Sequence, residues 1–209
     1  SLIKARGLRS LGNILQAIGD SDNSQKVLLQ SLNIAQKLNS KTDVAQGLLI
    51  LGNSAKVNDD ISTALDYYQK AAAIAPDNAS KLSAKINQFN LLIKIKQSAS
   101  ALELYTEIKN LLLLLPSSRF SVYSRVNLAQ SLIDNKLAGI DYRELSEILA
   151  IALKQARELQ DIRAESYAVG QLGHLYEQTN QFSEALNLTR NGINLANTIP
   201  ASDIAATLL

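Results

Sequence analysis

The sequence predicts an all-α protein built as a solenoid of helix-turn-helix repeats. Its 209 residues are 46% hydrophobic, which is enough apolar material to bury a core. The apolar residues are mostly Leu, Ile and Ala, aromatic residues make up only 5%, and the strand-favouring residues Val, Thr and Phe are few. A pattern also recurs along the chain, because Leu51-Gly52 precedes Ala64-Leu65 at the same interval at which Leu172-Gly173 precedes Ala185-Leu186.

The small residues at which paired helices are expected to cross predict five repeats and the start of a sixth. Gly12, Gly52, Ala129 and Gly173 take this crossing position, and Phe89 takes it in the most degenerate repeat, the third. Gly52 follows Gly12 by 40 residues (52−12), more than the usual repeat of about 34, so we expect longer helices and wider turns. The predicted repeats span about 5–38, 45–78, 82–115, 122–159 and 166–199, with a further start at 203–209, all in one domain covering residues 1–209.

Packing explains why the crossing residues are small. Glycine lets the first helix of a pair approach the second, and we expect small residues such as Ala64 and Ala185 opposite it. Each pair leaves an apolar face uncovered, so neighbouring repeats stack into a right-handed superhelix with a concave groove lined by the first helices. Residues 136–142 interrupt the fourth repeat and are predicted to form an enlarged loop.

Charge and cysteine content exclude several classes of function. Lys plus Arg is 21 against 19 for Asp plus Glu, without a basic stripe, which argues against a nucleic-acid or membrane-surface partner. The longest apolar run, 111–115, is far shorter than the roughly 20 residues of a membrane span. Without cysteine there is no disulfide or thiolate metal site, and a cytoplasmic location is favoured only because nothing suggests a secretory route. The chain ends at 207–209, within an expected helix, so we expect it to be a piece of a longer protein.

The recurring residues resemble the tetratricopeptide repeats. Leu172-Gly173, Tyr176 and Ala185-Leu186 carry this resemblance, and it covers nearly the whole chain. The stretch 163–196, together with 117–119 and 125–129, looks more particularly like the repeats that precede caspase-like CHAT domains in cyanobacterial proteins. That resemblance implies repeats that recruit or regulate, beside a separate domain that cleaves peptides through a His and Cys pair. This chain has no Cys and one His, so any protease activity would lie outside it.

A polar residue directly follows every crossing position. Each of the five has a side chain that both donates and accepts hydrogen bonds: Asn13, Asn53, Asn90, Gln130 and His174. On the first helix of a repeat this position faces the groove, so the five are predicted to form a ladder that holds an extended peptide backbone. The alternative is that a solvated groove position is simply polar.

Other candidate groove residues come from helical spacing. Arg6, Arg9 and Asn13 share one helical face, and Arg9 with Asn13 partly resembles the clamp that holds a peptide carboxylate in some tetratricopeptide proteins. The following repeat has Leu49 and Ile50 where such a clamp needs polar groups, so a solvated face is the competing interpretation.

Two tyrosines and three charged or titratable residues complete the predicted site. Tyr123 and Tyr167 occupy equivalent places in their repeats, where they would grip apolar peptide side chains or pack at a repeat junction. Glu177 is placed to orient His174 or merely to solvate its helix. Lys56 is also predicted to line the groove. A lone His without a second ligand or a nucleophile nearby predicts neither a metal site nor catalysis.

These observations predict a non-catalytic protein-interaction module without a cofactor. It would bind an extended peptide or a partner protein in its groove. One alternative is an intramolecular regulator that packs on an effector domain of the same parent chain. The other is a structural spacer or oligomerisation array, in which exposed residues 204–209 would pair two copies into a homodimer.

Overall fold

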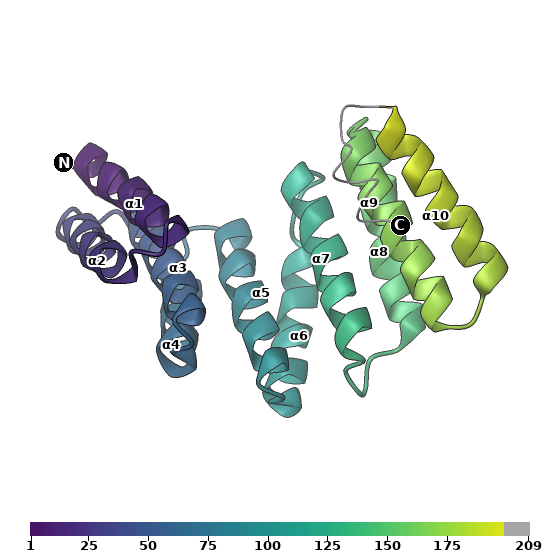
Figure 1. Cartoon of the computed structure of the whole chain (residues 1–209), viewed down its shortest axis with the longest axis horizontal. Helices are drawn as coiled ribbons and strands as arrows, with labels where there is room; N and C mark the ends of the chain where they lie inside the picture. Colours follow the sequence, from purple (N-terminus) through teal and green to yellow (C-terminus); the bar gives the residue numbers. More distant parts are fainter. Residues whose placement is uncertain (199–209) are drawn as a thin grey trace. The chain divides into compact units, whose positions relative to one another are not determined.

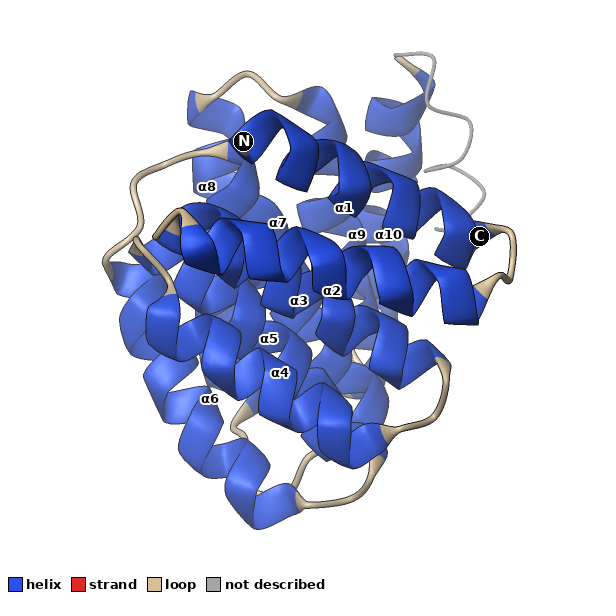
Figure 2. Cartoon of the chain, turned by 90° about the vertical axis from the view of Figure 1, so that its left-hand side faces the viewer, coloured by secondary structure: helices blue, strands red, loops and turns tan. Residues whose placement is uncertain are grey.

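A computed structural model describes residues 1–198, and this part of the chain consists of ten helices joined by short turns, with no strand (Figures 1 and 2). The helices are α1 (Leu2–Ala17), α2 (Ser21–Lys37), α3 (Lys41–Val57), α4 (Ile61–Ile74), α5 (Asn78–Lys94), α6 (Ser98–Leu113), α7 (Arg119–Asn135), α8 (Tyr142–Glu158), α9 (Ile162–Gln178) and α10 (Phe182–Asn197). The predicted all-α fold of helix-turn-helix pairs is confirmed. The helix predicted to open at 203 lies outside the described residues.

The chain divides into two compact units, Ser1–Leu111 and Leu112–Leu209. Helices α1 to α5 pack on one another in succession in the first unit, and α7 to α10 do so in the second. The first helix of a pair also contacts the first helix of the next pair, as α1 does with α3 and α7 with α9. The five helix pairs each start three or four residues before the predicted repeats. The interruption predicted in the fourth repeat is seen as the longer connection between α7 and α8.

The turns between the helices are short and share one design, so the greater length of the first repeats comes from helices of 16 or 17 residues. Six short connections place one residue in the left-handed region, namely Gly19, Asn39, Asp59, Lys96, Gln160 and Asn180. At Gly19 the backbone N–H donates to the carbonyl of Gln16, and the N–H of Asp20 donates to that of Leu15, which closes the end of α1. The Asp20 side chain then accepts from the N–H of Asn23 and starts α2. The same arrangement recurs at Ser40, Asp60 and Asp161, so a single residue ends one helix and caps the next.

The crossing positions contact large side chains sixteen residues later. A Cβ added to Gly12 would lie 2.5 Å from Leu28, and one added to Gly52 would lie 2.5 Å from Tyr68. Phe89, at the same position of the third pair, packs against Tyr105 with ring centroids 6.2 Å apart and the ring planes tilted by 32°. At Gly52 the nearest atoms all belong to the Tyr68 ring, so the absent side chain makes room for a buried tyrosine. Ala185 does lie close to Gly173, through its carbonyl oxygen, but the nearest group there is the Thr189 hydroxyl.

An ion pair between α1 and α3 stabilises the first unit. Asp43 is buried, and its carboxylate accepts from Arg6 Nε at 2.9 Å and from Arg9 Nη1 at 3.0 Å. The Ser40 hydroxyl donates to the same carboxylate. The hydrogen bond from Arg6, followed by those from Ser40 and Arg9, holds the pKa of Asp43 far below its ordinary range despite burial.

In the second unit a buried arginine joins three helices. Arg125 on α7 is 4% exposed and donates to the carbonyl of Leu112 at 2.6 Å, to the carbonyl of Ser121 and to the Gln155 side chain on α8. Leu112 lies in the last turn of α6, where free carbonyls carry partial negative charge. Burial lowers the pKa of the Arg125 guanidinium from its ordinary value, and these acceptors compensate for the lost hydration.

Candidate functional site

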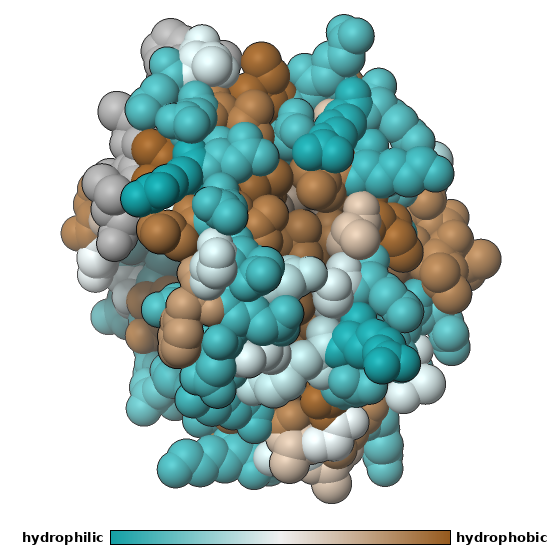
Figure 3. Space-filling model, turned by 90° about the vertical axis from the view of Figure 1, so that its right-hand side faces the viewer, coloured by the Kyte–Doolittle hydropathy of each residue, from teal (hydrophilic) through white to brown (hydrophobic). Residues whose placement is uncertain are grey.

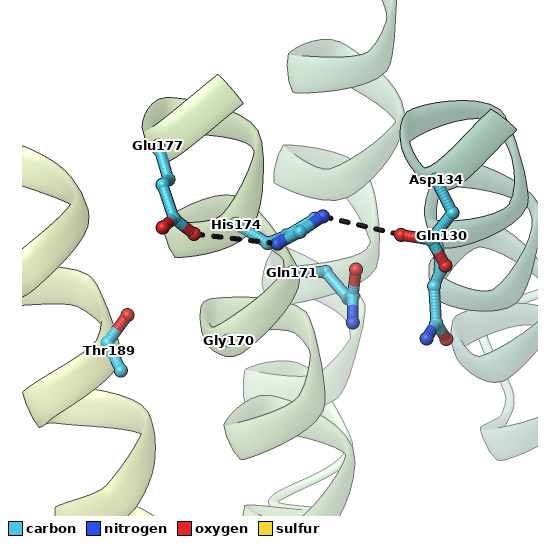
Figure 4. A pocket seen from close by; sticks show the side chains of 7 residues that line it. All are labelled: Gln130, Asp134, Gly170, Gln171, His174, Glu177 and Thr189. Carbon is cyan, nitrogen blue, oxygen red and sulfur yellow. Dashed lines mark ion pairs between the residues drawn. The ribbon is translucent and has the colours of Figure 1, made fainter. Parts of the chain in front are cut away.

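A hollow in the second unit brings several predicted site residues together. It has a volume of about 250 Å³ and is lined by Gln130 and Asp134 from α7, by Gly170, Gln171, His174 and Glu177 from α9, and by Thr189 from α10 (Figure 4). Gln130, His174 and Glu177 were predicted from the sequence, and the fold brings all three together.

The helices position these side chains through a common register. Helix α8 returns the chain between α7 and α9, so these two run in the same direction and contact each other. Residues 44 positions apart are therefore neighbours: Gln130 corresponds to His174, and Tyr123 corresponds to Tyr167. The two tyrosine rings meet edge to face with centroids 5.7 Å apart. The result is a strip along α7 and α9 with an aromatic pair toward the helix N-termini and the polar hollow toward the C-termini.

Within the hollow, His174 lies between two carboxylates. Its Nε2 is 3.3 Å from Asp134 Oδ1, and its Nδ1 is 3.7 Å from Glu177 Oε2 (Figure 4). Both acids are about half exposed, so solvent screens these contacts. Glu177 does approach His174, as its place three residues later on the same helix face predicted.

One polar atom of the hollow has no partner. Gln171 Oε1 is buried and makes no hydrogen bond in the described structure. A buried acceptor without a donor costs about 1–3 kcal/mol, and a ligand that donates a hydrogen bond there would recover this energy. Gln171 and Asp134 were not predicted as site residues, because their place in the hollow depends on how α7 and α9 are rotated relative to each other.

The predicted site residues of the first unit differ in exposure and in hydrogen bonding. Asn13 and Asn90 are exposed, Lys56 is partly exposed, and Asn53 accepts a hydrogen bond from the buried Tyr68 hydroxyl at 2.8 Å. Burial raises the pKa of that hydroxyl to about 12. Asn53 therefore already satisfies part of its hydrogen-bonding capacity inside the protein.

The arginines considered for a carboxylate clamp are engaged by the protein itself. Arg6 and Arg9 both bind the buried carboxylate of Asp43, which takes the place that a peptide carboxylate would need. Asn13 lies on the same helix but has no part in this ion pair. In the first unit these arginines are therefore already paired with a carboxylate of the protein, whereas their spacing had suggested that they were available to a ligand.

Neither a metal centre nor a membrane-spanning helix is found in residues 1–198. No group of three or more His, Cys, Asp or Glu side chains there is placed to hold a metal ion. None of the helices described is long and apolar enough to cross a membrane.

Comparison with known proteins identifies the fold. No family model matches the chain, and no curated protein matches it. Among solved structures, BtubC from P. vanneervenii superposes with a TM-score of 0.75 at 16% identity, covering 91% of this chain and 79% of BtubC. The tetratricopeptide-like repeats of a kinesin light chain from Podospora anserina give a TM-score of 0.72 at 18% identity, covering 96% and 99% of the two chains.

A third structure, YrrB, is described as a tetratricopeptide protein with an unusual peptide-binding site. It gives a TM-score of 0.50 at 18% identity and covers 96% of this chain and 89% of its own. These identities are too low to transfer a function, and nothing in the matches bears on the resemblance to CHAT-associated repeats. The chain has the fold of the tetratricopeptide-like helical solenoids.

Proposed function

We propose that the protein is a non-catalytic interaction module that binds an extended peptide segment along α7 and α9. The observation that carries this proposal is the alignment of two tyrosines and a polar hollow on neighbouring parallel helices. An aromatic pair offers apolar contact area, and the amides of Gln130 and Gln171 offer both donors and acceptors to a peptide backbone. The peptide-binding site described for YrrB, which shares the fold, supports the same class of function.

An extended peptide of a few residues would match the length of the strip. Tyr123 and Asp134 are eleven residues apart on α7, which corresponds to about 16 Å along the helix axis. An extended chain rises about 3.3 Å per residue, so about five peptide residues would cover the strip. If a longer parent chain supplies this segment from another of its domains, the same side chains would receive it.

The test uses a displayed library of random peptides of about twelve residues, each spanning about 40 Å when extended. Peptides selected on the purified chain are labelled, and their dissociation constants are measured by fluorescence anisotropy. We expect Tyr123→Ala and Gln130→Ala to weaken binding at least about tenfold, equivalent to about 1.4 kcal/mol. Gln30→Ala on the exposed face of α2 is the matched control and should leave affinity unchanged. Selected peptides that bind all variants equally would refute the α7 and α9 site.

Asn53→Ala alone cannot test whether Asn53 contacts the peptide. It removes the acceptor of the buried Tyr68 hydroxyl and so perturbs the first unit directly. Tyr68→Phe separates the two effects, because it frees the Asn53 side chain without changing its chemistry. If Asn53 contributes to a ladder, Asn53→Ala should weaken peptide binding while Tyr68→Phe should not.

A second candidate is a structural array that associates through its terminal helices. Ile3 and Ile14 on α1 and Ile18 directly after it are 84%, 60% and 72% exposed, and Phe182 and Leu186 on α10 are 63% and 50% exposed. Figure 3, which faces the α10 side, shows apolar side chains gathered between polar ones. Sedimentation equilibrium tests this candidate: a concentration-dependent dimer that Ile14→Ser with Ile18→Ser abolishes would favour it, and a monomer at all concentrations would exclude it.

A further inference from the structure

The hollow on α7 and α9 combines three features that favour a positively charged ligand. The first is its position at helix ends. Asp134 lies one residue before the end of α7, and Glu177 lies one residue before the end of α9. The C-terminal turn of a helix carries partial negative charge, so a carboxylate there is unfavourable and a cation is stabilised. Two parallel helices thus place two acids and two helix ends around the same cavity.

The second feature is an excess of acceptors. Asp134 and Glu177 offer four carboxylate oxygens, and Gln171 Oε1 is buried without a hydrogen-bond partner. His174 lies between the acids but has only two ring nitrogens to share with them. Lysine and arginine side chains carry several N–H donors and no acceptor, which complements this lining.

The third feature is size and access. A volume of about 250 Å³ is large enough to admit the end of a long side chain. His174 is about one-third exposed, and Asp134 and Glu177 are about half exposed, so the cavity opens to solvent rather than lying inside the core. A peptide lying along the strip would have direct access to it.

We infer that this hollow selects a lysine or arginine side chain of the bound peptide, while the Tyr123 and Tyr167 pair holds an apolar side chain of the same peptide. This inference rests on the proposed function and assigns its specificity. Because the hollow extends along the helices from about 11 Å (Gln130 and His174) to about 16 Å (the two acids) beyond the aromatic pair, the two peptide residues lie three to five positions apart when the peptide is extended.

The experiment compares peptides selected from the random library on three forms of the chain. These are the wild type, the double variant Asp134→Asn with Glu177→Gln, and the control Glu147→Gln, which removes an exposed acid from α8. The substitutions in the double variant keep size and remove charge, and circular dichroism melting checks that all three forms fold alike. The best wild-type peptide is then resynthesised with norleucine in place of each basic residue.

We expect Lys and Arg to be enriched three to five positions from an aromatic or aliphatic residue in the wild-type and Glu147→Gln pools. The double variant should lose this enrichment, and one norleucine replacement should weaken wild-type binding at least about tenfold. The inference would be overturned if the selected peptides were not enriched in Lys or Arg. It would also be overturned if neither the double variant nor the norleucine replacements changed the affinity. Both results would leave the proposed interaction module intact. A wild-type chain that selects no peptide would overturn the proposed function and this inference together.

Discussion

At the scale of single residues, the crossing glycines set how closely paired helices approach each other. The structure places Gly12 against Leu28 and Gly52 against Tyr68, each sixteen residues later in the chain. Both neighbours are buried, so the missing side chain of each glycine makes room for a large side chain of the second helix.

Two glycines of α3 provide a matched test of this packing. Gly52→Ala would place Cβ 2.5 Å from the buried Tyr68 ring, whereas Gly47→Ala would place it 3.5 Å from Leu32, an ordinary contact. We expect Gly52→Ala to lower the free energy of unfolding by about 1–3 kcal/mol through overpacking. Gly47→Ala should raise it by about 0.5–1 kcal/mol, because alanine favours the helix. Urea denaturation measures both, and equal effects of the two substitutions would contradict the packing.

Arg125 provides a second prediction for a single side chain. Arg125→Met keeps an apolar stem but leaves the Leu112 carbonyl and the Gln155 side chain without this donor. We expect a loss of about 2–4 kcal/mol in unfolding free energy. Arg190→Met, on the exposed face of α10, is the control and should change stability by less than about 0.5 kcal/mol. Chemical denaturation of the two variants decides, and a near-neutral Arg125→Met would show that the buried charge contributes nothing net.

At the scale of helices, the ion pair between α1 and α3 accounts for a feature that the sequence left ambiguous. The spacing of Arg6 and Arg9 indicated one basic face, and a ligand carboxylate was one possible partner. The fold supplies its own carboxylate from Asp43, 37 residues after Arg6. Periodicity identifies residues that share a helix face, but it does not show which distant residue will meet that face.

This ion pair predicts how acid affects stability. The pKa of Asp43 is lowered by its bonds to Arg6, Ser40 and Arg9, so its stabilisation is complete above the ordinary Asp pKa of about 3.9. It is lost as the pH falls from there toward the lowered pKa of the folded state. We expect Asp43→Asn to cost roughly 2–3 kcal/mol at pH 7 and to destabilise much less at pH 2.

Urea denaturation at the two pH values measures this difference. Glu103→Gln, an exposed acid of α6, is the control and should show no comparable change between them. A cost of Asp43→Asn that is the same at both pH values would rule out the ionised pair as its source.

At the scale of the whole molecule, the sequence predicted the helical repeats well and the site only in part. Composition and recurring small residues were enough for the fold, since each helix pair repeats the same local rules. Of the predicted ladder, Gln130 and His174 meet in one hollow, while Asn53 is engaged by Tyr68. Asp134 and Gln171 completed the hollow without any sequence signal, because their convergence arises only when α7 and α9 pack side by side.

The most direct test of the α7 and α9 site uses the single histidine of the chain as a reporter. The imidazole resonances of His174 are recorded by NMR at constant pH while a library-selected peptide is added. If the peptide lies along α7 and α9, these resonances should shift in proportion to the bound fraction measured by fluorescence anisotropy. Saturated binding with unmoved His174 resonances would place the peptide elsewhere and contradict the proposed site.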